Sequence, residues 1–283
     1  MQGACYFLST MPELPEVETT RRGIAPTVEG QVLRQLLIRN HQFRWPIPAD
    51  LPALVNGRQV LDTGRRGKYL WLNFEHGAMI IHLGMSGSIR HVHPDEAPRK
   101  HDHVDWVFPR GTLRLHDPRR FGAVLWHAHQ TGPLLEHPLL LKLGIEPFDP
   151  RFDGRWLHER TRGRTLPIKQ ALLAGDIVVG VGNIYASECL FRARIHPKTP
   201  ARRISLARHE RLAQAIRDTL SDALTAGGSS LRDYVGAGGE SGYFQIHAYV
   251  YDRAGQPCLS CQRPIRRVLQ GQRATYFCAH CQR

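Results

Sequence analysis

Four cysteines near the C-terminus constrain the fold of this chain more than any other feature. Cys258 and Cys261 are separated by two residues, sixteen residues follow, and Cys278 and Cys281 repeat the two-residue spacing. Two such pairs, one on a tight turn and one on a facing hairpin strand, can supply four thiolates to one tetrahedral ion. The spacing predicts one structural Zn2+ bound by all four cysteines. Two disulfides or four unrelated thiols are the alternatives.

The segment between the two cysteine pairs is basic and strand-like, and Gln270-Gly271 is its expected hairpin turn. The chain as a whole is also basic, because its 283 residues carry a formal net charge of +13. A surface with this charge attracts polyanions. No apolar run approaches the roughly 18 residues of a membrane-spanning helix. We therefore expect nucleic acid as the partner, and no membrane.

Cysteine usage and the first residues bear on the cellular compartment. Cys5 and Cys189 have no evident partners, which suits a reducing compartment. The first ten residues lack a basic start and are too short for a secretory signal. We therefore expect a cytoplasmic protein that is associated with the nucleoid.

The local sequence pattern changes near residue 143. Before this point, short apolar runs separated by turn residues predict an antiparallel β-sandwich or barrel. These runs span residues 69–74, 78–83, 103–108, 112–115 and 123–126. A short helix that Pro15 opens and that runs to about Arg22 is expected ahead of them.

After residue 143 the pattern is helical. Residues 168–192 predict two helices around a loop, and a longer helix is expected between Ser205 as its cap and Gly227-Gly228 as its end. Its apolar residues recur every four positions, at Leu212, Ile216, Leu220 and Leu224. A glycine-rich loop at 236–242 precedes the cysteine pairs. This order of segments predicts an α+β protein of two or three domains.

Met11-Pro12-Glu13 is the most unusual local sequence. A methionine before proline indicates that translation begins at Met11 and that methionine removal leaves Pro12 with a free secondary amine. Condensation of such an amine with an aldehyde carbon gives an iminium ion, which is always cationic and acts as an electron sink. Glu13 can shuttle protons beside it. The alternative is a proline-rich helix entry whose acidic residues interact with the helix dipole.

Two further clusters suit contacts with a distorted duplex. The run RRGK, ending at Lys68, can present this lysine to a backbone phosphate, and a solvated turn is the alternative. Met85 in HLGMSG, and Arg119 and Phe121 in DPRRFG, lie on glycine-flanked turns from which side chains can project. One arginine and two apolar wedges can fill the space left by an extruded base. The alternative places Met85 and Phe121 in the core.

Two other patterns have a functional and a structural interpretation each. The loop VGVGN at 179–183 can offer free backbone N–H groups to a phosphate at a helix start, or form a plain helix–helix turn. It does not match the longer dinucleotide-binding fingerprint. His101, His103 and His116 lie in strand-like sequence among aspartates and are candidates for a second metal site, with plain strand positions as the alternative.

Taken together, these motifs resemble the formamidopyrimidine-DNA glycosylase family of base-excision repair. MPELPEVETTRRG, RRGKYL, HLGMSG, DPRRFG, VVGVGNIYASE, GGSSLRD, GYFQ and the cysteine pairs occur in the family's order, from Met11 to the C-terminus. The sequence MPELPEVE resembles the 8-oxoguanine branch of the family. The related endonuclease VIII branch typically has glycine at the position of Leu14. The resemblance implies a bacterial, monomeric, bifunctional DNA glycosylase and AP lyase that acts on duplex DNA containing oxidised purines.

The resemblance also implies catalytic roles. Pro12 would attack C1′ of the flipped nucleotide, and Glu13 would assist opening of the deoxyribose ring. Lys68 would favour the elimination steps, Arg273 belongs to the same catalytic group, and Glu16 would support the site. The expected products are a free base and, by β,δ-elimination, a one-nucleotide gap.

Contacts with DNA follow from the same resemblance. Met85, Arg119 and Phe121 would occupy the void in the duplex, with Arg119 facing the orphaned cytosine. The flanking phosphates would be held by Arg120, Lys169, Asn183 and Arg273. A loop that closes over the oxidised purine would include Arg232 and Tyr243.

Four segments are expected: a spurious or disordered extension (1–10), a catalytic β-sandwich (11–143), a helix-two-turn-helix domain (144–235), and the lesion loop with the zinc finger (236–283). If residues 1–10 are retained, the Pro12 nitrogen is an amide whose delocalised lone pair cannot form an iminium. The chain would then bind lesions without cutting DNA. An enzyme that prefers oxidised pyrimidines is a further alternative.

Overall fold

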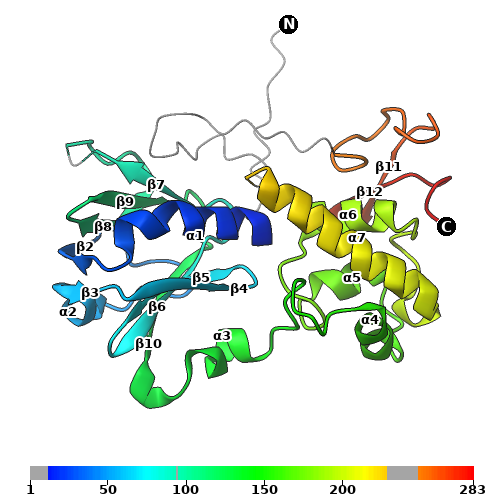
Figure 1. The fold of residues 1–283 in the computed structure, drawn as a ribbon. Helices are drawn as coiled ribbons and strands as arrows, with labels where there is room; N and C mark the ends of the chain where they lie inside the picture. Colours follow the sequence, from blue (N-terminus) through cyan, green and yellow to red (C-terminus); the bar gives the residue numbers. More distant parts are fainter. Residues whose placement is uncertain (1–11, 94, 228–247) are drawn as a thin grey trace, which may run out of the picture. The chain divides into compact units, whose positions relative to one another are not determined.

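The computed structural model describes residues 12–93, 95–227 and 248–283, which form two compact units (Figure 1). The first unit takes Pro12 and residues 16–137 of this described part, and the second takes residues 13–15, 138–227 and 248–283. Each unit has its own apolar core. Within the described ranges, no helix is both long and apolar enough to cross a bilayer.

The first unit is built on two four-stranded antiparallel sheets, ordered β10-β6-β5-β4 and β2-β8-β9-β7. Their strands are β2 (Gln35–Ile38), β4 (Asp62–Arg66), β5 (Tyr69–Phe74), β6 (Gly77–His82), β7 (Ser88–Val92), β8 (Asp102–Phe108), β9 (Gly111–His116) and β10 (Ala123–Ala128). A short pair, β1 (Val32–Leu33) and β3 (Arg58–Gln59), and helix α2 (Leu51–Val55) complete it. The predicted apolar runs all became strands.

Side-chain alternation explains the sandwich. In β5, Leu70, Leu72 and Phe74 are buried while the residues between them are half-buried, as expected for a strand with one face on the core. Residues of both sheets belong to one core cluster, in which the indole N–H of Trp106 on β8 donates to the sulfur of Met79 on β6 at 3.1 Å. The sequence therefore specifies two sheets packed face to face.

Helix α1 (Leu14–Val28) is longer than predicted, because it continues past Arg22 for a further turn and a half. Val17, Ile24 and Val28 share one buried face at helical spacing and pack into the core of the first unit. Pro26 lies inside the helix, where it removes one backbone hydrogen bond. It is tolerated because Pro26 and Arg22, whose carbonyl loses its partner, are both exposed.

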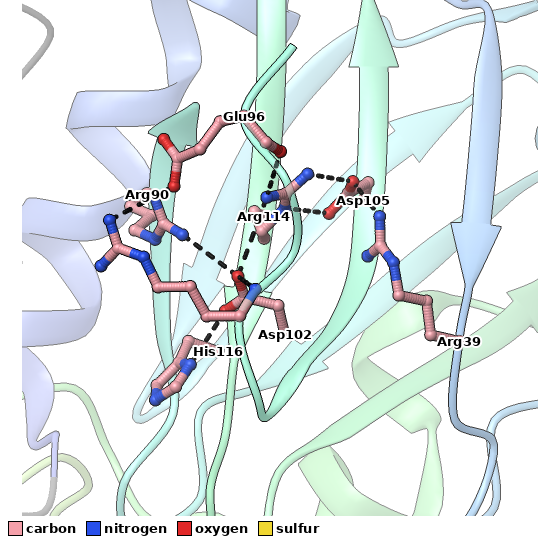
Figure 2. Close-up of polar contacts among 8 residues, drawn as sticks. Arg39, Arg90, Glu96, Asp102, Asp105, Arg114 and His116 are labelled. Carbon is pink, nitrogen blue, oxygen red and sulfur yellow. Dashed lines mark hydrogen bonds and ion pairs between the residues drawn. The ribbon is translucent and has the colours of Figure 1, made fainter. Parts of the chain in front are cut away.

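A network of charges covers the other face of the β8–β9 pair (Figure 2). Arg114 donates two hydrogen bonds to Asp105, at 2.7 and 2.8 Å, and both side chains are buried. Asp102 accepts from Arg90 at 3.1 Å and lies 2.9 Å from His116 Nδ1. Burial opposes ionisation of both aspartates, but hydrogen bonds from their partners outweigh it and lower the pKa of each carboxyl. The network explains how β8 and β9 can be buried on both faces.

The second unit is helical apart from its C-terminal hairpin. Its helices are α3 (Pro138–Leu141), α4 (Gly154–Thr161), α5 (Ile168–Leu173), α6 (Asn183–Arg192) and α7 (Leu206–Thr225). The predicted pair around a loop is α5 and α6, and the predicted long helix is α7, with Leu212, Ile216 and Leu220 fully buried. Ser205 occupies the N-cap position of α7, but its side chain makes no capping hydrogen bond.

The C-terminal hairpin joins β11 (Arg266–Gln270) to β12 (Arg273–Phe277). The turn is Gly271-Gln272, one residue later than predicted, because Gln270 is the last paired residue of β11 and faces Arg273. Both turn residues have positive φ, +56° and +59°, as a two-residue hairpin turn of this type requires. The buried amide of Gln270 donates to the Pro197 carbonyl, which favours the observed register.

Candidate DNA-binding and catalytic site

The four predicted zinc ligands come together at the end of the chain. Their sulfur atoms all lie within 4.8 Å of one another, with Cys258 and Cys278 buried and Cys261 and Cys281 half-buried. The Cys258–Cys281 and Cys261–Cys278 sulfurs are 3.9 and 3.5 Å apart. A disulfide requires about 2.05 Å, whereas sulfurs around a tetrahedral zinc with 2.3 Å bonds are about 3.8 Å apart. The cluster is a structural zinc site.

Lys169 and Asn183 both contact the hairpin that this zinc site supports. The Lys169 ammonium donates to Thr275 Oγ1 at 2.9 Å and to the Ala274 carbonyl at 3.2 Å, and the Asn183 amide donates to the same carbonyl at 3.1 Å. Lys169 is 1% exposed. Burial lowers its pKa to about 7, an effect that the charge of Glu13 partly offsets. Both residues therefore fix the strand that begins at Arg273.

Glu13 caps the N-terminus of α6. Its carboxylate accepts hydrogen bonds from the backbone N–H groups of Gly182 at 2.6 Å, Ile184 at 2.9 Å and Tyr185 at 3.4 Å, and Glu13 is 1% exposed. A Cβ atom at Gly182 would lie 2.2 Å from the Glu13 carboxyl carbon, so this position requires glycine. The loop at 179–183 was predicted to offer free N–H groups to a phosphate, but at this helix start the N–H groups of Gly182, Ile184 and Tyr185 bind the Glu13 carboxylate instead.

Lys68 lies at the tip of the β4–β5 hairpin, in the two-residue turn Gly67-Lys68, and is half-buried. Arg65 holds this turn, because its Nη1 donates to the Gly67 carbonyl at 2.9 Å and its Nε to Glu18 Oε2 at 3.1 Å. Burial opposes ionisation of Glu18, but hydrogen bonds from Arg21 and Arg22 outweigh it and lower its pKa to about 2. Glu18 therefore stays charged and links α1 to the turn that carries Lys68.

The predicted wedge residues lie on two neighbouring loops at residues 83–87 and 117–122. Phe121 is 40% exposed, and the guanidinium carbon of Arg119, itself exposed, lies 4.8 Å from the Phe121 ring centre. Met85 is half-buried and belongs to none of the core clusters. The core interpretation is therefore wrong for Phe121. Arg120, on the same loop, has a φ of +54°.

The histidines are not a second metal site. His103 Nε2 lies 3.1 Å from the Asp117 carbonyl, and His116 Nδ1 lies 2.9 Å from Asp102. Among the residues that the structure describes, the four cysteines are the one cluster with metal-ligand geometry.

Glu188 is a positioning residue that the sequence analysis did not predict. Glu188 on α6 accepts three hydrogen bonds, of 2.7 to 3.0 Å, from the backbone N–H groups of residues 249–251, at the entry to the zinc hairpin. A single glutamate inside a helical pattern gives no signal for this role. Glu16, a predicted supporting residue, is 4% exposed. Arg232, Tyr243 and residues 1–10 lie outside the described residues.

The sandwich, the paired helices and the zinc hairpin define a zinc-finger protein that binds nucleic acid. Three family models match the chain in this order: the formamidopyrimidine-DNA glycosylase N-terminal domain (residues 11–124), the formamidopyrimidine-DNA glycosylase H2TH domain (143–235), and the zinc finger found in FPG and IleRS (255–283). The chain belongs to the formamidopyrimidine-DNA glycosylase family.

Relatives by sequence and by structure agree with this assignment. Formamidopyrimidine-DNA glycosylases of Bordetella avium and Burkholderia multivorans are 70% and 59% identical to this chain, each over 96% of it and 100% of the relative. The Thermus thermophilus MutM (Fpg) structure has a TM-score of 0.84 at 41% identity, covering 96% of this chain and 98% of its own. The Lactococcus lactis Fpg complex with abasic-site DNA has a TM-score of 0.87 at 32% identity, covering 96% and 99%.

Proposed function

We propose that this chain excises oxidised purines from duplex DNA and then cleaves the strand at the resulting abasic site. Its 70% identity to a formamidopyrimidine-DNA glycosylase over nearly the whole chain supports this proposal. So do the Lactococcus lactis relatives bound to DNA containing Fapy-dG or an abasic site. The observation that carries the proposal is the anchoring of Glu13 by three backbone amides, since it fixes the residue next to Pro12.

The chemistry begins at Pro12. The nitrogen lone pair of Pro12 attacks C1′ of the damaged nucleotide. The bond between C1′ and the base nitrogen breaks, and the electron pair of that bond leaves with the base. The Pro12 nitrogen then loses its proton, opening of the sugar ring breaks the C1′–O4′ bond and gives a cationic iminium, and Glu13 passes a proton to O4′. The iminium withdraws electrons, so that loss of a C2′ proton expels the 3′ phosphate. A second elimination expels the 5′ phosphate. Lys68 lies beside the phosphates that leave.

The second unit supplies phosphate contacts. Arg273 is exposed at the first position of β12, the strand whose next two residues are held by Lys169 and Asn183. Cys258, Cys261, Cys278 and Cys281 would hold a Zn2+ ion, whose bonds would fix the ends of this hairpin. In the first unit, Arg120 contacts a phosphate that flanks the extruded nucleotide. The space that its base leaves in the duplex is filled by Met85, Arg119 and Phe121.

The free amine of Pro12 requires that residues 1–11 are absent from the mature protein. The N-terminal family model matches from residue 11, which supports a start at Met11. We propose that the mature chain acts as a monomer in the bacterial cytoplasm on nucleoid DNA. Retention of residues 1–10 would instead leave a protein that binds lesions without cutting them.

Product analysis on a panel of duplexes tests the substrate class. The chain beginning at Pro12 should release 8-oxoguanine and formamidopyrimidine bases faster than oxidised pyrimidines, and leave a one-nucleotide gap bounded by phosphates. Faster release of oxidised pyrimidines would identify the alternative enzyme. Binding to all lesions without base release would identify the lesion-binding protein.

A further inference from the structure

Asp117 connects the two loops that carry the wedge residues. It stands at the start of the 117–122 loop and is fully buried. Its Oδ1 accepts a hydrogen bond of 2.8 Å from the Ser86 hydroxyl on the 83–87 loop, and one of 3.3 Å from the Arg119 N–H on its own loop. Its Oδ2 accepts from the Gly122 N–H at 2.9 Å. One carboxylate therefore closes its own loop and holds the neighbouring one.

The two loops also touch through their backbones. A Cβ atom at Gly84 would lie 2.4 Å from the Phe121 carbonyl carbon, and one at Gly122 would lie 2.7 Å from the His82 carbonyl oxygen. Gly84 has a φ of +65°, and its N–H donates to His82 Nδ1 at 2.9 Å. These contacts leave no room for a side chain between the loops, so a shift of one loop moves the other.

The backbone of Asp117 is fixed to the β8–β9 end of the sheet. Its N–H donates to the His101 carbonyl at 3.0 Å, and its carbonyl lies 3.1 Å from His103 Nε2. The preceding residue, His116, lies in the charge network through Asp102 (Figure 2). Asp117 thus has a rigid support, and the loops project from it.

We propose that Asp117 is a positioning residue that holds the 83–87 and 117–122 loops as one wedge, and that discrimination of the base opposite the lesion depends on it. This inference rests on the proposed function, in which Arg119 faces the orphaned base. Arg119 can reject a wrong base only if its backbone is held in place, and the Asp117 carboxylate supplies that restraint. Met85 and Phe121 then enter the duplex already arranged, which limits the conformational entropy lost on binding.

The test uses the chain beginning at Pro12 and the variants Asp117→Asn and Ser86→Ala. Asn keeps the size of the side chain but loses the charge and one of the two acceptor oxygens. Asp95→Asn is the matched control, because it removes the same charge from a side chain that is 90% exposed. Single-turnover excision of 8-oxoguanine is measured opposite cytosine and opposite adenine. Borohydride trapping on single-stranded abasic DNA, which needs no wedge, reports the chemistry alone.

We expect Asp117→Asn to reduce the cytosine-to-adenine preference by about tenfold, in line with the loss of a hydrogen bond to a charged group. Ser86→Ala should give a smaller reduction, and Asp95→Asn none. Single-stranded trapping should be the same in all four proteins. An unchanged preference in Asp117→Asn and Ser86→Ala, or an equal loss on every substrate including the single strand, would overturn the inference. Failure of the unsubstituted chain to be trapped would instead refute the proposed function. If Asp117→Asn does not fold, Ser86→Ala decides the question alone.

Discussion

Arg65 holds the turn that carries Lys68, although Arg65 itself has no part in the proposed chemistry. Its guanidinium bridges Glu18 on α1 and the carbonyl of Gly67, next to Lys68. The side chain of Arg65 is 12% exposed and contacts Glu18 and Gly67 at the same time. Because Lys68 lies on a two-residue turn, the orientation of that turn decides where its ammonium points.

Arg65→Met should therefore slow strand cleavage at a preformed abasic site by about tenfold or more, as expected for a displaced catalytic group. Glu18 keeps its ion pairs with Arg21 and Arg22, so the protein should remain folded. The measurement is the single-turnover cleavage rate on abasic duplex, with Arg58→Met on the exposed strand β3 as control. Equal rates for the two variants would contradict this role.

His209 gives the second unit a sensitivity to acid. It is fully buried on α7, with Nε2 3.1 Å from the Thr161 hydroxyl, and burial lowers its pKa to about 4, helped by the charge of His158. The unfolded chain takes up a proton near pH 6.5 and the folded chain only near 4. The unfolded state therefore binds more protons between these values, so the free energy of unfolding falls as pH drops from about 6.5 to about 4.

His209→Gln should flatten that loss of stability, because glutamine can still donate to Thr161 but does not titrate. Chemical denaturation at several pH values between 4 and 7 measures the slope. His82 in the first unit also has a pKa lowered to about 4, by burial and by the charges of Lys68 and Arg44, so part of the slope should remain. An identical slope in the variant would exclude His209 as a contributor.

At the scale of elements, the charge network holds the β8–β9 pair. Arg114→Met leaves Asp105 and Asp102 buried without this partner and should lower the free energy of unfolding by about 3–5 kcal/mol. Arg99→Met removes an arginine whose side chain is 70% exposed and should change it by about 0–1 kcal/mol. Denaturant titration of both variants checks the difference. Similar small effects for both would mean that the network contributes little to stability.

The zinc hairpin is a second element whose role can be isolated. Cys261→Ser should remove the metal and weaken binding to lesion DNA about tenfold or more, the effect of losing about 1.4 kcal/mol of contacts. The β-sandwich of the first unit should keep its circular dichroism. Cys189→Ala, at a buried free thiol in α6, is the control and should retain one zinc per chain. Loss of zinc with an unchanged dissociation constant would contradict the hairpin's role.

Element boundaries were predictable where one local signal dominates. Strand β5 was predicted at its observed limits, since its apolar residues alternate and turn residues flank it. The end of α1 was not, because Gly23 and Pro26 weaken the local helix signal and only packing of Ile24 and Val28 sustains the last turns. The hairpin turn was displaced by one residue because the burial of Gln270, a tertiary contact, sets the register.

At the scale of the whole molecule, the zinc ligands could be predicted from cysteine spacing, and the nucleic-acid partner from the net positive charge. The sequence did not predict what holds the site in place. Asp117, Arg65 and Glu188 act through partners that lie 31 to 63 residues away in the sequence, so no spacing rule identifies them. The contacts of Lys169 and Asn183 with the hairpin, 91 to 106 residues further on, could not be predicted for the same reason.

The central claim is that Pro12 forms the covalent intermediate, and borohydride trapping tests it most directly. Protein purified from its native host is weighed intact, incubated with 8-oxoguanine duplex and borohydride, and the adduct is mapped by peptide mass. We predict a mass that begins at Pro12 and an adduct on the Pro12 nitrogen. A mass that retains MQGACYFLST with no trapped adduct, or an adduct on a lysine, would contradict the account.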